Sequence, residues 1–203
     1  GEELFPEVLK VLSEMKGRPR GERLEALAEI EGVYVPSLVE WSFIPGRESA
    51  FRSSRHSLPV RRRIVDSLDD AFFPDMLMVP SAGIVHDRVA MEIFRGCTRG
   101  CRFCQAGMIT RPVRERSTAK VVEQTLSLVE KTGWEEVGLL SLASCDYSGI
   151  SDVVRELSAG LASSNVRLSL PSLRMDSFSV DLAAGMETMR RGGLTFAPEA
   201  GSQ

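Results

Sequence analysis

Hydrophobic positions in the second half of the chain alternate between short continuous runs and longer stretches with one apolar face. The runs at residues 85–94, 137–142, 166–170 and 194–197 predict four strands. The stretches between them carry apolar residues three and four apart and predict three helices. Ser117 and Ser151 are the expected caps of the first two helices, and Gly133 is the expected end of the first. This alternation favours βαβ units and a parallel sheet.

The first part of the chain has a different pattern. Residues 3–16 and 22–30 carry short helical stripes, whereas periodicity fades from Val33 to about Ala82, where prolines recur. We therefore expect residues 1–82 to be a mostly helical and irregular flank and residues 83–203 to form the α/β domain. The chain starts without methionine and ends just after an apolar run, so we expect an internal fragment of a longer protein.

Chemically distinctive residues follow each predicted strand. Because ligands of parallel sheets gather at the carboxyl ends of the strands, these segments predict one shared site. The residues concerned are the cysteines after the first strand, Ser144, Cys145 and Asp146 after the second, Arg174 and Asp176 after the third, and Glu199 and Ser202 after the fourth.

Three cysteines crowd into the first of these segments. Cys97, Cys101 and Cys104 form a Cys-x3-Cys-x2-Cys pattern, and the fourth cysteine of the chain, Cys145, lies on a different loop. Iron–sulfur cubes usually have four cysteine ligands, so three thiolates would leave one iron open. An open metal position is typical of catalysis. A zinc site, completed by Cys145 or His86, and a structural role for the thiols remain alternatives.

Composition narrows the function classes further. The formal net charge is −3, which gives no overall attraction to nucleic acid or to anionic lipid. No apolar run is long enough to span a bilayer, and residues 1–30 do not have the pattern of a signal peptide, so we expect no membrane association. Clustered thiols suit a reducing compartment, and we expect a cytoplasmic protein.

The cysteine motif resembles that of the radical S-adenosylmethionine (SAM) superfamily. The resemblance implies a partial (β/α) parallel barrel, here cut after its fourth strand, with Cys97, Cys101 and Cys104 binding a [4Fe–4S] cluster whose open iron chelates SAM. It implies reductive cleavage of SAM to a 5′-deoxyadenosyl radical that abstracts hydrogen from a substrate. The resemblance places Phe103 near the adenine of SAM, and it assigns further SAM contacts to Ser144, Asp146, Glu199 and Ser202. Arg174 suits a bidentate pair with the carboxylate of SAM, and a salt bridge to Asp176 or Glu199 is the alternative. The segment Ala143–Asp146 replaces the Gly-Gly-Glu type motif of the superfamily, and no residue is assigned to catalysis itself.

A longer string, from Arg95 to Ser117, is similar to bacterial radical SAM proteins with a cobalamin-binding-like domain ahead of the barrel. Residues 1–9 resemble the end of that domain and residues 32–36 the linker after it, so cobalamin would be bound only through an upstream domain. The family implies a one-electron reductant of the flavodoxin or ferredoxin type. The substrate is unknown, with RNA among the candidates.

Two other interpretations stay open. One is a metal-stabilised RNA-binding module, suggested by the basic run between Arg52 and Arg63 and by arginines after the cysteines. Against it, no aromatic residues are interleaved with these charges as a stacking platform would require. The other is a scaffold that holds a purely structural cluster.

Overall fold

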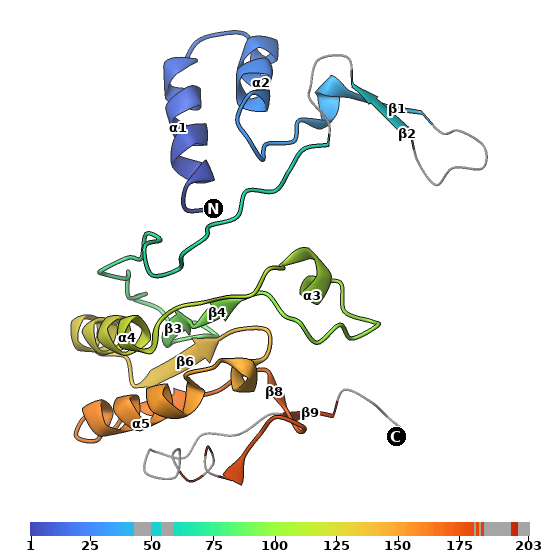
Figure 1. The fold of residues 1–203 in the computed structure, drawn as a ribbon. Helices are drawn as coiled ribbons and strands as arrows, with labels where there is room; N and C mark the ends of the chain where they lie inside the picture. Colours follow the sequence, from blue (N-terminus) through green and yellow to red (C-terminus); the bar gives the residue numbers. More distant parts are fainter. Residues whose placement is uncertain (43–49, 54–58, 181, 183, 185–195, 199–203) are drawn as a thin grey trace. The chain divides into compact units, whose positions relative to one another are not determined.

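The chain folds into two compact units, Gly1–Asp66 and Ser67–Gln203. The computed structural model describes residues 1–42, 50–53, 59–180, 182, 184 and 196–198 (Figure 1). The second unit takes in residues 67–82, which the hydrophobic pattern assigned to the flank. Leu68 explains the difference, because its side chain is only 1% exposed and its carbonyl accepts a 2.5 Å hydrogen bond from Arg116. A single buried leucine in a loop leaves no periodic signal in the sequence.

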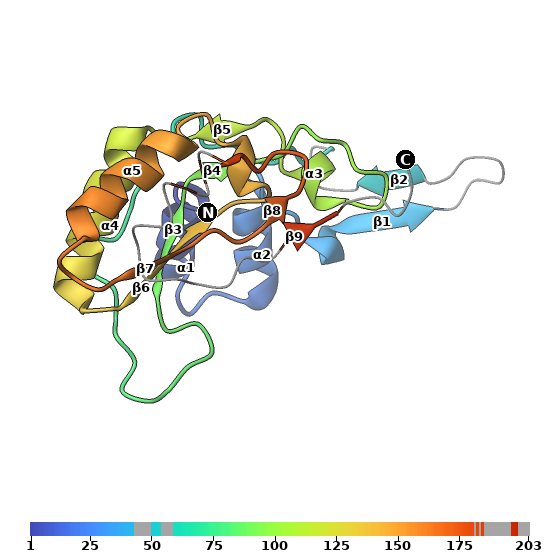
Figure 2. The same ribbon diagram turned by 90° about the horizontal axis from the view of Figure 1, so that it is seen from below.

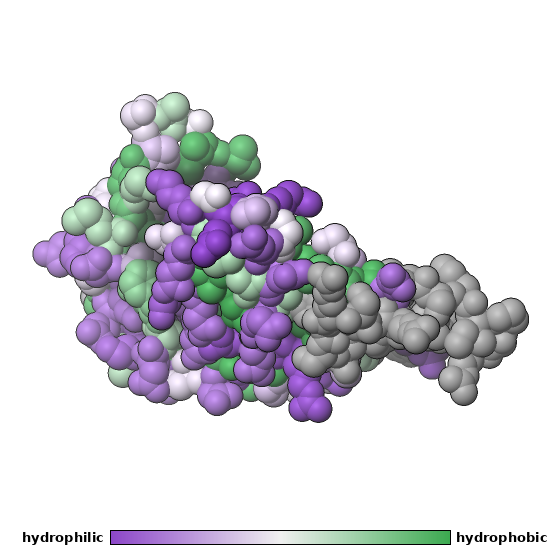
Figure 3. Space-filling model, turned by 90° about the horizontal axis from the view of Figure 1, so that it is seen from above, coloured by the Kyte–Doolittle hydropathy of each residue, from purple (hydrophilic) through white to green (hydrophobic). Residues whose placement is uncertain are grey.

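The first unit contains the two predicted helices, α1 (Leu4–Glu14) and α2 (Arg20–Ala28). A short 3-10 turn, η1 (Pro36–Leu38), leads into β1 (Val39–Ser42), which pairs antiparallel with β2 (Ala50–Ser53). Arg63 binds Glu3 and Glu7 at 3.2 and 2.7 Å and so ties the end of this unit to its first helix. Hydrophobic residues also reach the surface in patches, as Figure 3 shows for one face, and Phe5 and Leu9 of α1 are exposed.

The second unit is built on a parallel sheet. Its strands β3 (Val89–Glu92), β6 (Glu136–Leu140) and β7 (Arg167–Ser169) stand in the order β3-β6-β7. Helices α4 (Thr118–Thr132) and α5 (Ile150–Leu161) lie side by side along one face of this sheet (Figure 2). Alternate strand residues point into the core beneath them: Val89, Met91, Val137, Leu139 and Leu168. The predicted mixed α/β fold with a parallel sheet is confirmed.

The opposite face of the sheet carries mostly small or charged residues, with Leu140 as an exposed apolar exception. Ala90, Gly138 and Ser169 form one register row across the three strands. At the amino-terminal edge, Glu136 binds both Arg88 and Arg167, at 2.8 and 3.1 Å. In a closed barrel this face would line the interior, but the described residues form an open sheet, as expected for part of a barrel.

Helix boundaries follow the predicted caps in one case and not in the other. The Ser117 hydroxyl accepts a 3.3 Å hydrogen bond from the Lys120 amide, and Gly133 ends α4 in a left-handed conformation, as predicted. The prediction for Ser151 is wrong, because α5 begins at Ile150 with Gly149 as its cap. The third predicted helix, from residue 180, lies largely outside the described residues.

Several strands are shorter or paired differently from the prediction. The run at 85–94 divides into β3 and a separate β4 (Phe94–Arg95), which pairs antiparallel with β5 (Arg114–Glu115). The last predicted strand is β9 (Phe196–Ala197), which pairs parallel with β8 (Leu173–Arg174), a short strand that the hydrophobic pattern did not predict. Among the described residues, no helix is both long and apolar enough to cross a membrane.

Candidate metal and cofactor site

The three clustered cysteines lie on a loop that is closed at its base by backbone pairing. Phe94 pairs with Glu115 and Arg95 with Arg114. The two ends of the segment between β4 and β5 are therefore held side by side. Gly96 is the first residue of that segment and has a φ of 94°. A Cβ placed there would lie 2.7 Å from the Pro112 carbonyl oxygen. Glycine is therefore required at position 96, where the backbone of one arm of the loop approaches Pro112 in the other arm.

Two of the three thiols, those of Cys97 and Cys104, lie against the short helix α3 (Ala106–Ile109), which follows them. A Cβ on Gly107 would lie 3.9 Å from the sulfur atoms of both Cys97 and Cys104. These two sulfurs therefore face the same glycine, with no side chain between them and the helix. Each of the three thiols is partly exposed. Phe103 is 75% exposed, so its ring is available to a ligand.

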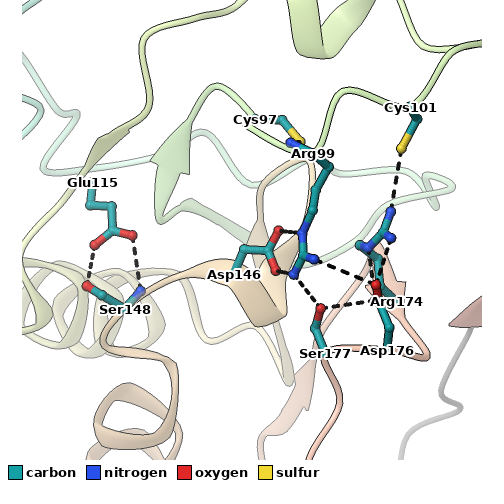
Figure 4. Close-up of polar contacts among 9 residues, drawn as sticks. All are labelled: Cys97, Arg99, Cys101, Glu115, Asp146, Ser148, Arg174, Asp176 and Ser177. Carbon is teal, nitrogen blue, oxygen red and sulfur yellow. Dashed lines mark hydrogen bonds and ion pairs between the residues drawn. The ribbon is translucent and has the colours of Figure 1, made fainter.

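Arg99, inside the cysteine loop, joins this loop to two others (Figure 4). Its Nε donates to Asp146 of the turn η2 (Ser144–Asp146) at 2.7 Å, and its Nη2 binds the second oxygen of the same carboxylate. The Nη2 also donates to the Ser177 hydroxyl at 2.6 Å, and Nη1 lies 3.6 Å from Asp176. One guanidinium thus connects the segments that follow β4, β6 and β8.

Arg174, at the end of β8, approaches the cysteines from another direction (Figure 4). Its Nε and Nη2 donate to the two carboxylate oxygens of Asp176 at 3.1 and 2.9 Å, which is a bidentate pair. Its Nη1 lies 3.6 Å from Cys101 Sγ and donates to it. The Arg174 side chain is only 13% exposed, so this contact is largely shielded from water.

The charges of this network perturb one another. The hydrogen bond from Arg99 holds the pKa of Asp146 below its usual range, and the bond from Arg174 lowers the pKa of Asp176 to about 2. The bond to Asp146 raises the pKa of Arg99. Both carboxylates are therefore ionised at neutral pH. Cys145 differs from these groups, because burial raises the pKa of its thiol.

The structure brings together most of the residues that the sequence singled out. The cysteine loop, Asp146 and Arg174 lie in one connected network at the carboxyl edge of the sheet. Ser144 is fully buried, and its hydroxyl donates to the Pro171 carbonyl at 2.6 Å, so its side chain ties two loops together. Glu199 and Ser202 lie outside the described residues.

Two contacts of the site were not anticipated. Ser177 binds Arg99, and Glu115 accepts a 3.0 Å hydrogen bond from the Ser148 amide and another from the Ser148 hydroxyl (Figure 4). Neither serine belongs to a recognisable motif, so no sequence signal could have found them. Arg99 itself lies between two cysteines, and that placement was the one available sign of its role.

The donor set fits an iron–sulfur cluster. The cysteines, all within the described residues, are not joined in disulfides. Two of them already accept hydrogen bonds, Cys97 from the Arg99 amide at 3.4 Å and Cys101 from Arg174, as cluster sulfurs commonly do. In the described part of the chain, no three His, Cys, Asp or Glu side chains converge as they would around a single ion. A cube binds each thiolate at a different iron, so its ligands surround it at larger mutual distances than the ligands of a single ion.

The fold and site define an α/β protein that carries its cysteine loop at the carboxyl edge of a parallel sheet. The family model described as the radical SAM superfamily matches residues 91–195, which include all three cysteines, β6, α5 and β7. The chain belongs to the radical SAM superfamily.

A relative from Methanocaldococcus jannaschii, named uncharacterized protein MJ0966, is 36% identical over 113 residues. The aligned region is 56% of this chain and 24% of that protein. The chain therefore spans about a quarter of the length of the curated relative that it matches.

Proposed function

We propose that this chain carries the cluster-binding part of a radical SAM enzyme, with Cys97, Cys101 and Cys104 as the three ligands of a [4Fe–4S] cluster. The observation that supports this most directly is the placement of the three thiols. They share a loop with a closed base, at the edge of the sheet where loops from three strands meet. Superfamily membership supplies the chemistry expected there: a cluster held by these thiolates would supply one electron to the sulfonium of SAM, and the carbon–sulfur bond would break to give methionine and a 5′-deoxyadenosyl radical.

The residues of the chain would bind and orient the two cofactors. Phe103 offers an exposed ring next to Cys104, where it would pack against the adenine of SAM. The Ser144 hydroxyl is used within the protein, so the backbone of the segment after β6 supplies the acceptors for the amino group of SAM. Arg174 already holds Asp176 through two nitrogens, so a SAM carboxylate would have to displace Asp176 to reach it.

The network of ion pairs would hold the cysteine loop in place before the cofactors bind. Arg99 fixes the loop to Asp146 and to the segment after β8, so the thiols would not need to be ordered by the cluster itself. Preformed ligands lower the conformational cost of binding. Glu199 and Ser202 remain proposed contacts of SAM, and a flavodoxin- or ferredoxin-type protein remains the proposed electron donor.

Anaerobic reconstitution with iron and sulfide tests the cluster assignment. We expect about four irons per chain and the visible absorbance of a cube. Alanine at position 97, 101 or 104 should remove most of the iron, because each thiolate binds its own corner. Cys145→Ala is the matched control, since it removes a thiol from another loop and should retain the iron. Loss of iron in Cys145→Ala with retention in Cys101→Ala would refute the assignment, and one zinc per chain would favour the RNA-binding module.

The activity test requires the full-length parent protein as well as this chain. With dithionite and SAM, the reconstituted parent should form 5′-deoxyadenosine slowly even without substrate, and Cys104→Ala should form none. A parent protein that holds a complete cluster but never yields 5′-deoxyadenosine, with or without cell extract as a source of substrate, would establish a structural cluster instead.

A further inference from the structure

Arg174 stands out among the charged residues of the site because it contacts a cysteine from outside the cysteine loop. The loop that holds Cys101 follows β4, whereas Arg174 ends β8. Its Nη1 donates to Cys101 Sγ at 3.6 Å, a normal distance for a hydrogen bond to sulfur. The same side chain is only 13% exposed, so water screens its charge weakly at that point.

Asp176 determines the direction of that donor. The carboxylate takes the Nε and Nη2 of Arg174 at 3.1 and 2.9 Å, and this bidentate grip fixes the plane of the guanidinium. With that edge held, Nη1 projects toward Cys101, as Figure 4 shows. Asp176 is in turn held by Ser177, whose hydroxyl donates to it at 3.1 Å, and by Arg99 at 3.6 Å.

We propose that Arg174, oriented by Asp176, is a positioning residue that raises the reduction potential of the cluster by donating a charged hydrogen bond to Cys101 Sγ. Hydrogen bonds to the sulfurs and nearby charge are two of the factors that set cluster potentials. Reduction adds one negative charge to the cluster, and a fixed cationic donor stabilises the reduced form more than the oxidised form. The inference rests on the proposed function, because it presupposes that Cys101 binds a cluster.

The test is a redox titration of the reconstituted chain with dithionite in the absence of SAM, followed by electron paramagnetic resonance. Each dithionite-derived electron reduces one cluster, so the midpoint is that of a one-electron couple. Arg174→Gln removes the charge and the directed donor. It should lower the equilibrium constant for reduction about tenfold, which is a shift of about 59 mV to more negative potential.

Two further variants separate a directed donor from charge alone. Arg174→Lys keeps the charge, but its single nitrogen cannot bind both oxygens of Asp176 and also donate to Cys101. Its midpoint potential should therefore lie between those of wild type and Arg174→Gln. Arg155→Gln is the matched control: it removes the same charge from an ion pair with Asp152 on the exposed face of α5 and should leave the potential unchanged.

The outcomes distinguish this inference from the function on which it rests. If the wild-type chain takes up no iron, the proposed function fails and this inference fails with it. If wild type holds its cluster but Arg174→Gln has an unchanged midpoint, only the inference is overturned. A wild-type midpoint in Arg174→Lys also overturns it, because charge alone would then be sufficient. If Arg174→Gln holds no iron, the test rests on Arg174→Lys, which preserves the charge: a midpoint below that of wild type supports the inference, and an unchanged midpoint overturns it.

Discussion

Gly96 carries the chain into the cysteine loop at a point where no side chain fits. Its φ is 94°, and a Cβ there would lie 2.7 Å from the Pro112 carbonyl oxygen. Gly133 also has a positive φ, 70°, but a Cβ there would meet nothing within 4 Å. A side chain at Gly133 would therefore meet backbone strain alone, whereas a side chain at Gly96 would meet both backbone strain and steric overlap.

Replacing each glycine by alanine tests that separation. Gly133→Ala should cost about 1–2 kcal/mol of unfolding free energy, the usual penalty of a left-handed conformation for a residue with a Cβ. Gly96→Ala should cost more, because the two arms of the loop must also move apart, and it should reduce iron uptake after reconstitution. Chemical denaturation and iron analysis measure both effects. Equal losses of stability with unchanged iron would show that the loop adapts without cost.

The Arg99–Asp146 pair makes a prediction about pH. The pKa of Asp146 is lowered in the folded protein by its hydrogen bond from Arg99, so the unfolded chain binds more protons in the acid range. The stabilisation is therefore complete above the ordinary aspartate pKa of about 3.9 and is lost as pH falls through the lowered value.

Asp146→Asn should accordingly be less stable than wild type at neutral pH, by about 1 kcal/mol or less for a partly exposed pair. The difference should shrink as the pH falls below about 4, because the unfolded wild-type chain takes up a proton at this carboxyl first, and it should vanish once the pH has passed the lowered pKa of the folded state. Urea denaturation across this pH range measures it. Glu156→Gln, on the exposed surface of α5, serves as the control and should track wild type. A gap between Asp146→Asn and wild type that widens in acid would contradict the assignment.

Among the elements, the helices were the most predictable from sequence and the short strands the least. The apolar stripe of α4 and its two capping residues specify that helix locally, so both ends could be predicted. The pairs β4–β5 and β8–β9 involve strands of two residues, too short to show alternation. Arg99 meets Asp146 only because parallel strands bring their carboxyl ends together. The sequence could therefore indicate the edge at which these residues gather, but not which side chains pair.

Ser117, which caps α4, and Ser151, which lies inside α5, give a matched test of helix capping. Ser117→Ala removes the side-chain acceptor of the Lys120 amide and should cost about 1 kcal/mol of stability. Ser151→Ala lies inside the first turn of α5 on an exposed position and should change stability by less than about 0.5 kcal/mol. Thermal or urea unfolding compares them, and equal costs would mean that the α4 cap contributes nothing of its own.

At the scale of the whole molecule, the boundary between the two units lies before Leu68. Leu68→Ala should lower the stability of the second unit by about 2–5 kcal/mol, because it empties a fully buried site. Ile64→Ala, four residues earlier in the first unit and partly exposed, is the control and should cost much less. Iron release from the reconstituted chain, measured as the denaturant concentration rises, would report the unfolding of the unit that holds the cysteines. A negligible effect of Leu68→Ala would place residues 67–82 with the flank after all.

The antiparallel pair at the base of the cysteine loop has a consequence for the length changes that this loop can tolerate around it. Because β4 and β5 bring the two ends of the loop together by backbone pairing, the closure of the loop does not depend on the lengths of the helices and strands around it. We therefore expect changes in the lengths of α4 and α5 to leave the two ends of the loop paired. The loop from Phe94 to Glu115 would then keep its closed base even where the segments after β6 and β8, which Arg99 and Arg174 join to it, change in length.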